Sequence, residues 1–571
     1  MLSARPCVNS RSLEASLPLA MAFHFDRNCQ LLGPFIGHTT ETETHIWLHL
    51  ADLSPGERRT VHITVHPERP TTRAVQRHQL VVSEEECGVG VLALSGLEPD
   101  TLYVYRLWWD ESGLAPVDLQ GLEPEDTCFR TLPRGGFDPQ LDFLVMSCHN
   151  PETAVRDGAN GFAVWAQMPQ IIAHNKNVRF ALLIGDQLYA DDVERKALRE
   201  EDPHKRVKLY LGIYRKYWSD LRYRRVLCRL PAYLMWDDHD ITDGWGSRED
   251  SFEGEQSDVI QSSWKRMFMS ARKAFQHMQA SRNPPPLSPE YREGFDTCFR
   301  IGRAGFVLAD LRSHRNVRQG RIWTEAQLSG VASWVASQRE HLDVLFFCSS
   351  VVFSHGHHGL EALMRSGWPY VLQAVSWMGS IRYAGLRSMA SSFHKNVGDL
   401  RDDLNDSWGA EPNRREADRV LDFLFGLQNP PQGQRPISVV VLAGDIHTPG
   451  YSTLYSSDPA HEARPSIPHI VASPVSYQPF SWMAEAVYRR LTRVVTLGER
   501  GVYSAQVSHH FSQRNVVVAS LRNVASEEWH LKVKFYLEGY PEPRILLFDL
   551  HRSSGREDIP WPHAREPSLL G

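Results

Sequence analysis

A run of acidic residues directly after an apolar stretch constrains this chain more than any other feature of its sequence. The stretch Leu234–Gly246 reads LMWDDHDITDGWG and contains five side chains that could bind a cation: Asp237, Asp238, His239, Asp240 and Asp243. Adjacent carboxylates at the end of a strand repel one another unless a cation lies between them. The stretch therefore predicts a metal site, with a solvated acidic turn as the alternative.

The same design, an apolar strand that ends in polar side chains, recurs along the chain. Besides the acidic run, it occurs at LVMSCHN, LLIGDQLYADD, FVLADLRSHR, LFFCSSVVFSHGHH and VVLAGDIHT. A segment of helical spacing between the first two strands predicts parallel strands with both faces covered. In open α/β folds the ligand site lies beyond the carboxyl ends of such strands. Six strands with this ending predict one shared site.

The N-terminal part of the chain has a different pattern. Short alternating runs such as THIWLHL, TVHITVHP and LYVYRLWW, separated by Pro, Gly and acidic turns, are typical of a small immunoglobulin-like or fibronectin-like β-sandwich. The segment PRGGFDPQ is a predicted linker. The predicted organisation is an N-terminal tail (1–24), the β-sandwich (25–135), a large second domain (136–550) that ends in antiparallel strands, and a C-terminal tail (551–571).

Two kinds of helical segment are predicted within the second domain. The basic and aromatic stretch 208–230 fits one amphipathic helix with a charged outer face, and phosphate contact is the alternative. Residues 251–286 and 361–405 are predicted helical insertions near the mouth of the site.

Composition limits the class of protein and its partners. A hydrophobic fraction of 42% with 23% charged residues over 571 residues predicts a soluble protein of two domains. The formal charge of −6 argues against specific nucleic-acid binding. The eight cysteines form no CxxC pair, which favours a reducing compartment. Neither a transmembrane run nor a secretory signal is expected, so a cytoplasmic location is favoured over a secreted or mitochondrial one.

The predicted site is rich in oxygen donors, joined by imidazoles, one thiol and one phenol. Carboxylates suit Ca²⁺, Mg²⁺ or Mn²⁺, whereas a thiolate at Cys148 and a phenolate at Tyr189 suit Fe³⁺. Asp186 lies between these sets in the sequence and is the natural bridge between two metals, which would clamp a phosphoryl group. Because the chain has neither a GxSxG motif nor a Walker loop, a metal-activated water is the predicted nucleophile.

The ordered set SCHN, GDQLYADD, WDDHD and AGDIHT after a small β-sandwich resembles the PhoD-type alkaline phosphatase/phosphodiesterase family, a branch of the calcineurin-like metallophosphatases. The resemblance covers nearly the whole chain. It implies an α/β (α+β) metallophosphatase core, with a two-layered β-sheet flanked by helices. It also implies hydrolysis of phosphomonoesters or phosphodiesters at a di- or trinuclear site. The implied metals are Fe³⁺ and Ca²⁺, with Mg²⁺, Mn²⁺ or Zn²⁺ as alternatives, and the implied partner is a small phosphate ester.

The resemblance also assigns roles to individual residues. His239 would stabilise the transition state or protonate the leaving group, Asp240 would orient His239, and Arg312 would contact the substrate phosphate. Many family members have glutamate in place of this aspartate. A structural ion pair with Asp310 is the alternative for Arg312. The implied metal ligands are Cys148, Asn150, Asp186, Tyr189, Asp238, Asp445 and His447.

Two other readings of the function stay open. One is a catalytically weak member whose metal site serves binding or scaffolding, since a fold does not fix a function. The other is a narrow phosphodiesterase for lipid headgroups or nucleotides. At single positions, Cys148 could instead be a buried apolar residue and Tyr189 a cap on the core. The histidines His355, His357 and His358 are not assigned to the site, because a solvent-exposed loop explains them equally well.

Overall fold

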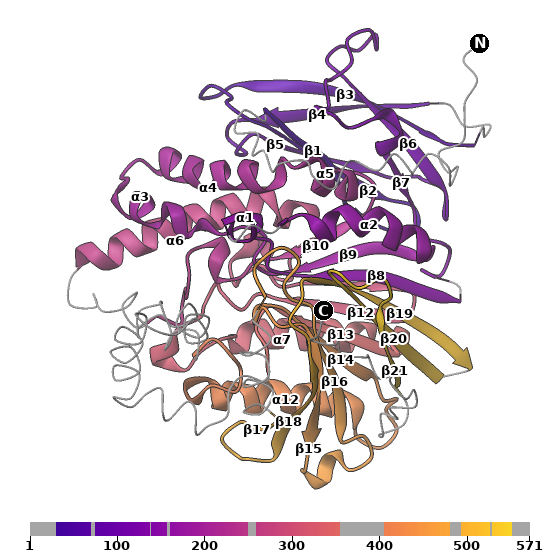
Figure 1. The fold of residues 1–571 in the computed structure, drawn as a ribbon, viewed down its shortest axis with the longest axis vertical. Coiled ribbons are helices and arrows are strands. Elements are labelled where there is room, and N and C mark those ends of the chain that lie inside the picture. The colour runs from indigo at the N-terminus through magenta and orange to yellow at the C-terminus, as the bar shows by residue number, and fades with distance from the viewer. Residues whose placement is uncertain are drawn as a thin grey trace, which may run out of the picture.

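The structure is a computed structural model of the whole chain (Figure 1). The second predicted insertion up to residue 404, the histidines at 355–358 and both predicted tails lie outside the described residues. The described residues are 30–69, 75–137, 139–156, 160–248, 258–353, 405–479, 493–525 and 528–550.

The N-terminal strands form one antiparallel sheet of seven strands in the order β1-β2-β5-β4-β3-β6-β7. Alternate residues such as Val61, Ile63 and Val65 point into a core of their own, as the period of two predicts. Its classification as an immunoglobulin-like or fibronectin-like sandwich stays a prediction, as do the domain boundaries. The strands are β1 (Leu31–Thr39), β2 (Thr44–Leu50), β3 (Arg58–Pro67), β4 (Gln76–Ser83), β5 (Val89–Leu94), β6 (Leu102–Trp108) and β7 (Cys128–Arg130).

Among the described residues, two mixed sheets make up the rest of the β-structure. Their strand orders are β10-β9-β8-β19-β20-β21 and β11-β12-β13-β14-β16-β15-β18-β17. The strands of the first are β8 (Gln140–Met146), β9 (Val178–Ile184), β10 (Ala232–Met235), β19 (Asn515–Ala525), β20 (Glu528–Leu537) and β21 (Arg544–Asp549). Those of the second are β11 (Thr297–Ile301), β12 (Ala304–Ala309), β13 (Val344–Ser349), β14 (Ser438–Ala443), β15 (Gly450–Ser456), β16 (Ser466–Val471), β17 (Val494–Leu497) and β18 (Tyr503–His510).

The two mixed sheets pack face to face on one apolar core. The ring of Phe143 on β8 lies edge-on to Phe306 on β12 and Phe346 on β13, with centroids 5.4 and 5.1 Å apart. Within the first sheet β8, β9 and β10 are parallel, and within the second β12, β13, β14 and β16 are parallel. All six strands predicted to end in polar residues are present, and the three C-terminal strands are antiparallel as predicted.

Helices cover the outer faces of the two sheets (Figure 1). The predicted helix 208–230 is two helices, because Ser219 and Asp220 separate them and the Asp220 carboxylate caps α5 by accepting from the Arg222 N–H. The first predicted insertion contains α6. The α-helices among the described residues are α1 (Pro151–Arg156), α2 (Ala163–His174), α3 (Glu194–Arg199), α4 (Pro203–Trp218), α5 (Leu221–Leu227), α6 (Asp258–Met278), α7 (Glu325–Gln338) and α12 (Arg414–Gln428).

A buried arginine joins the N-terminal sheet to the helical layer beneath it. The guanidinium of Arg282 lies 5.1 Å from the ring of Phe35, 5.3 Å from that of Trp47 and 4.9 Å from that of Trp218. Phe35 and Trp47 belong to the N-terminal sheet and Trp218 ends α4. Cation–π contacts out of water fix the two layers against each other.

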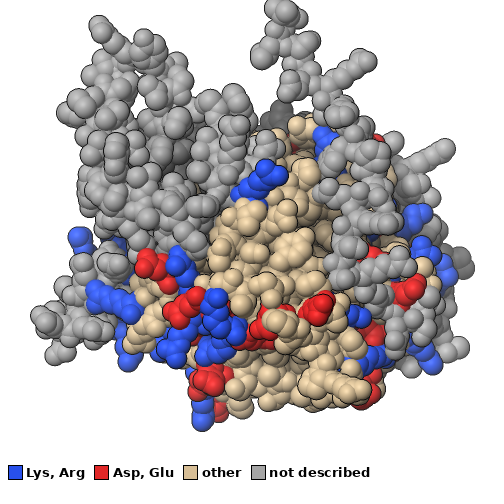
Figure 2. Space-filling model, turned by 90° about the horizontal axis from the view of Figure 1, so that it is seen from below, with Lys and Arg blue, Asp and Glu red and all other residues tan. Residues whose placement is uncertain are grey.

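The charged surface shows no large area of one sign where it is visible. On the face seen in Figure 2, described Lys and Arg side chains alternate with Asp and Glu along the lower border, and few lie in the centre. Among the described helices, none has the length and apolar character needed to cross a membrane.

Candidate active site

The carboxyl ends of parallel strands from both sheets meet at one place and bring the predicted polar residues together. Cys148 follows β8, Asp186 follows β9, Asp238 lies beyond β10, and Asp445 and His447 follow β14. The Cys148 thiol lies 3.4 Å from Oδ2 of Asp186 and 3.4 Å from the carbonyl oxygen of Asp445. Residues separated by almost 300 positions are therefore in contact.

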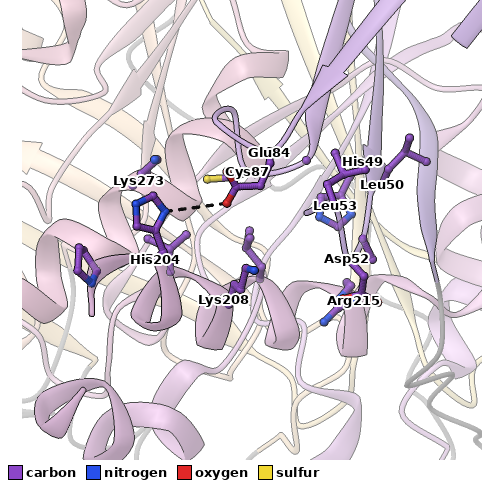
Figure 3. A pocket seen from close by; sticks show the side chains of 15 residues that line it. His49, Leu50, Asp52, Leu53, Glu84, Cys87, His204, Lys208, Arg215 and Lys273 are labelled. Carbon is purple, nitrogen blue, oxygen red and sulfur yellow. Dashed lines mark hydrogen bonds and ion pairs between the residues drawn. The ribbon is translucent and has the colours of Figure 1, made fainter. Parts of the chain in front are cut away.

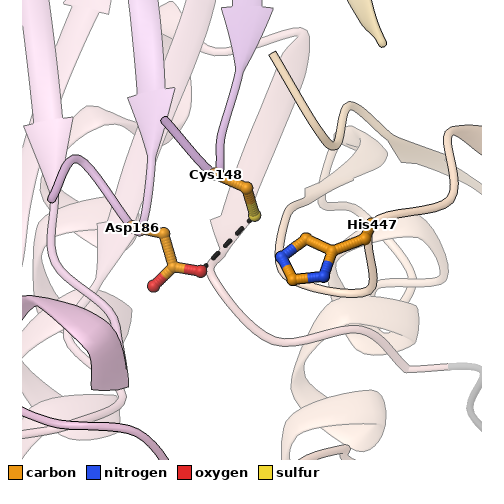
Figure 4. Close-up of side chains that lie close together, drawn as sticks. All are labelled: Cys148, Asp186 and His447. Carbon is orange, nitrogen blue, oxygen red and sulfur yellow. Dashed lines mark hydrogen bonds between the residues drawn. The ribbon is translucent and has the colours of Figure 1, made fainter. Parts of the chain in front are cut away.

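Asp186 is the common member of three groups of side chains that could each hold a metal ion. Within each group the ligand atoms lie within 4.8 Å of one another. Figure 4 shows the first group, in which the thiol, the carboxylate and the imidazole come from three different strand ends. The groups are Cys148, Asp186 and His447; Asp186, Asp238 and His239; and Asp186, Asp237 and Asp445.

The chemistry of these side chains fits bound metal ions. Oδ1 of Asp186 and Oδ2 of Asp237 are buried and have no hydrogen-bond partner among the described residues. Burial, and then the neighbouring aspartates, raise the pKa of Asp445 well above its usual value. Burial likewise raises the pKa of Asp186, which the other aspartates raise further. A cation is what allows several ionised carboxylates to share a buried site.

The turns that carry these residues are strained. Four site residues have a positive φ in the left-handed region, which costs energy for any residue except glycine. Next to one of them, Gly444 packs so closely that an added Cβ would lie 2.5 Å from the carbonyl oxygen of Ile184. The close approach brings the end of β14 against the end of β9. The four residues and their φ values are Cys148 (58°), Asp186 (52°), Asp445 (67°) and His447 (53°).

Tyr189 lies between the first and second groups. Its hydroxyl donates to Oδ2 of Asp186 at 3.3 Å and lies 3.1 Å from Nε2 of His447. Its ring lies 4.1 Å from that of His239, and the ring of Tyr477 stacks on His447 at 3.8 Å. Tyr477 has no counterpart in the sequence prediction, because nothing near it in the sequence marks the site.

The structure gives His239 a different partner from the predicted one. Nδ1 of His239 lies 2.9 Å from Oδ2 of Asp191. Asp240 instead accepts hydrogen bonds from the Asp237 N–H and from Gln279, each at 2.8 Å. The short turn Asp238–Asp240 uses the Asp240 carboxylate as a cap and points it away from the imidazole. The carboxylate in contact with Nδ1 is therefore that of Asp191, which lies in the motif GDQLYADD, and not that of Asp240.

Arg312 faces carboxylates and is fully buried. Its guanidinium is hydrogen-bonded to Asp237, lies 3.3 Å from Oδ1 of Asp238 and 2.8 Å from Oδ2 of Asp406. The predicted alternative was an ion pair between Arg312 and Asp310. In the structure Asp310 accepts a hydrogen bond from the backbone N–H of Arg312, and the guanidinium pairs with other aspartates. The predicted contact between Arg312 and substrate stays a prediction.

Asn150 has local hydrogen bonds. Its side-chain oxygen accepts from the N–H of Thr153 and from the hydroxyl of Tyr217, both at 3.3 Å. The first bond caps the start of α1. The predicted metal-ligand role of Asn150 stays a prediction. Asp237, which belongs to the third group, was visible in the acidic run but was not predicted as a ligand.

Comparison with known proteins agrees with this geometry. The sequence model of the family PhoD, described as PhoD-like phosphatase, matches residues 143–342. This segment includes the end of β8 and the strands β9, β10 and β12, with the residues that follow them from Cys148 to Arg312. The resemblance to PhoD-type phosphatases is confirmed.

A solved structure of PhoD has the same fold. The TM-score is 0.58 at 15% sequence identity, and the match covers 93% of this chain and 92% of that one. Among curated proteins, the uncharacterized protein YGR266W of Saccharomyces cerevisiae (strain ATCC 204508 / S288c) is 21% identical over 379 residues. The match covers 55% of this chain and 52% of the yeast protein, about half the length of that relative.

Proposed function

We propose that the chain hydrolyses phosphate esters at a centre of at least two metal ions that share Asp186. The observation that carries this proposal is the membership of Asp186 in all three candidate metal groups. A carboxylate has two oxygens, and an aspartate common to adjacent groups is placed to bridge neighbouring metals. Both phosphomonoesters and phosphodiesters are candidate substrates.

The donor types support two different metals. Cys148, Tyr189 and His447 offer sulfur, a phenol oxygen and nitrogen on one side of Asp186, a set that favours Fe³⁺. Asp237, Asp238 and Asp445 offer only oxygens, a set that favours Ca²⁺, with Mg²⁺ or Mn²⁺ as alternatives. When bound, such metals would neutralise the phosphoryl charge and lower the pKa of an attacking water.

His239 is the proposed general acid, so in this proposal it does not bind a metal and the second group contributes only its two aspartates. Because Asp191 holds Nδ1, Nε2 is the atom proposed to face a substrate, and in the structure it lies 3.8 Å from Oδ1 of Asp243. As the P–O bond breaks, Nε2 would pass its proton to the leaving oxygen, and Asp191 would stabilise the charged imidazole. Arg312 would act through the carboxylates: its pairs with Asp237 and Asp238 fix their position relative to Asp186.

The experiment compares the wild-type chain with Asp186→Asn on p-nitrophenyl phosphate and bis(p-nitrophenyl) phosphate. Asp142→Asn is the matched control, because this buried aspartate lies at the other end of the strand that leads to Cys148. We expect wild type and the control to turn over at least one ester, a chelator to remove this turnover and added Ca²⁺ to restore it.

The ratio of the two rates then separates a monoesterase from a diesterase. Equal rates for wild type and Asp186→Asn, on folded and metal-loaded protein, would contradict the proposal. That outcome would leave the binding or scaffold function as the remaining explanation.

A further inference from the structure

A cavity that shares no lining residue with the three candidate metal groups lies between the N-terminal sheet and the helices α4 and α6 (Figure 3). Its volume is about 160 Å³. Side chains from the end of β2, from the β4–β5 turn and from both helices line it. None of these side chains belongs to the three candidate metal groups.

The charges around this cavity leave two ammonium groups without a carboxylate. Among the described residues, Arg215 is paired with Asp52 at 3.2 Å and His204 lies 3.9 Å from Glu84. The other two cationic side chains that line the cavity are Lys208 and Lys273. Neither forms an ion pair with a carboxylate among the described residues. Three cationic side chains face two acidic ones, which gives an excess of one positive charge.

The inner part of the cavity offers a buried imidazole and apolar walls. The His49 side chain is only 2% exposed, and its Nδ1 has no hydrogen-bond partner among the described residues. Buried polar atoms without a protein partner point to a ligand or water that satisfies them. Burial lowers the pKa of His49 to about 3, so the ring is neutral at pH 7. Leu50, Val207 and Leu211 form the apolar wall.

We infer that this cavity binds a small organic anion. Its headgroup would lie between the ammonium groups of Lys208 and Lys273, with a short apolar body against Val207 and Leu211. Cavities between domains, with mostly apolar walls and a few polar groups, are typical of small-molecule sites. Carboxylate and phosphate headgroups share the required chemistry, since an ammonium recognises either as a point charge. The inference does not depend on the proposed phosphatase activity.

Site-specific acetylation of the full-length, metal-loaded protein tests the inference. The acetylation rate of each lysine is measured by mass spectrometry in the presence of benzoate, phenylphosphonate or the neutral benzamide. We expect at least one of the two anions to slow the reaction of Lys208 and Lys273 several-fold and saturably. The matched controls are Lys205 on α4 and Lys265 on α6, which are exposed and lie outside the cavity. Their rates are expected to stay unchanged.

Comparison of the two anions identifies the headgroup, because both carry the same phenyl body. Protection by neither anion would overturn the inference, and so would equal protection by benzamide. The double variant Lys208→Met/Lys273→Met gives a second measurement. We expect it to lose the rise in Tm caused by the protecting anion while its turnover of p-nitrophenyl phosphate stays within twofold of wild type. An undiminished rise in Tm would also overturn the inference.

Discussion

Oδ2 of Asp191 lies 2.9 Å from Nδ1 of His239, while Nε2 of the same ring lies 3.8 Å from Oδ1 of Asp243. Asp240, the direct neighbour of His239 in the sequence, binds Gln279 and the Asp237 N–H instead. We therefore expect the two aspartates to have separable roles, one in the proposed proton transfer and one in the fold of the acidic run.

The first prediction separates these two roles. We expect Asp191→Asn to lower kcat by about 10- to 100-fold, the usual effect of removing a partner that orients a functional imidazole. The loss should be greater for phenyl phosphate than for p-nitrophenyl phosphate, because the poorer leaving group needs the proton more. We expect Asp240→Asn to lower Tm without this dependence on the leaving group. Equal losses on both esters for Asp191→Asn would contradict the role of His239 as general acid.

The second prediction concerns Arg312. Removing one member of a buried ion pair typically costs about 3–5 kcal/mol, because the remaining charge is left uncompensated. We expect Arg312→Met to lower Tm and the number of metals bound, because Asp237 and Asp238 lose their shared partner. A residue that contacts substrate phosphate would instead raise KM with Tm unchanged. Measurement of Tm, metal content and KM on one preparation decides between these outcomes.

The third prediction concerns the close approach of two strand ends. A methyl group on Gly444 would meet the Ile184 carbonyl oxygen at 2.5 Å, so Gly444→Ala must separate β14 from β9. We expect a clear loss of turnover and of bound metal, because the shift moves Asp445 away from Asp186. Gly426→Ala in α12 is the control, since nothing lies within 4 Å of the added methyl group and alanine favours a helix. Normal turnover in Gly444→Ala would show that the site tolerates the shift.

The fourth prediction concerns the acid sensitivity of the fold. Burial, and then His510, lower the pKa of His469 from 6.5 to about 3. Between these two values the unfolded chain binds a proton that the folded chain excludes, so stability falls as pH falls. The slope is about 1.4 kcal/mol per pH unit for one histidine. We expect His469→Gln to lose less Tm than wild type between pH 7 and pH 5.

Scanning calorimetry at the two pH values measures this effect. The control is His530→Gln, because the side chain of His530 is exposed on β20. The same change in Tm with pH for wild type and His469→Gln would show that another group is responsible for acid sensitivity.

The positions of the site residues were predictable where they depend on local sequence. An apolar run followed by SC, DD or GD, the last of which occurs twice, marks the end of a parallel strand. The ends of parallel strands in one sheet meet at one edge. This rule brings Cys148 and Asp186 together, since both follow strands of the first sheet. Asp445 follows a strand of the second sheet, and its contact with Cys148 comes from the packing of the two sheets. The break between α4 and α5 was not predicted, because one helix was expected across the capping residue Asp220.

The partners of these residues could not be predicted, because they depend on contacts between distant segments. Which aspartate reaches His239 depends on the path of the turn after β10 and on Gln279 from beyond α6. The direction of Arg312 depends on Asp406, which is 94 positions away. A local sequence pattern does not specify the distance or the orientation between side chains that lie far apart in the sequence.

The central claim, a metal centre that shares Asp186, is tested most directly by the metal content of the protein. The number of metal ions bound per chain is measured by mass spectrometry for wild type, Asp186→Asn and Asp142→Asn. Turnover is measured on the same samples. We expect about two or more ions per chain in wild type and in Asp142→Asn. In Asp186→Asn we expect fewer ions and no turnover. Turnover by metal-free wild type, or full metal content and turnover in Asp186→Asn, would contradict the account.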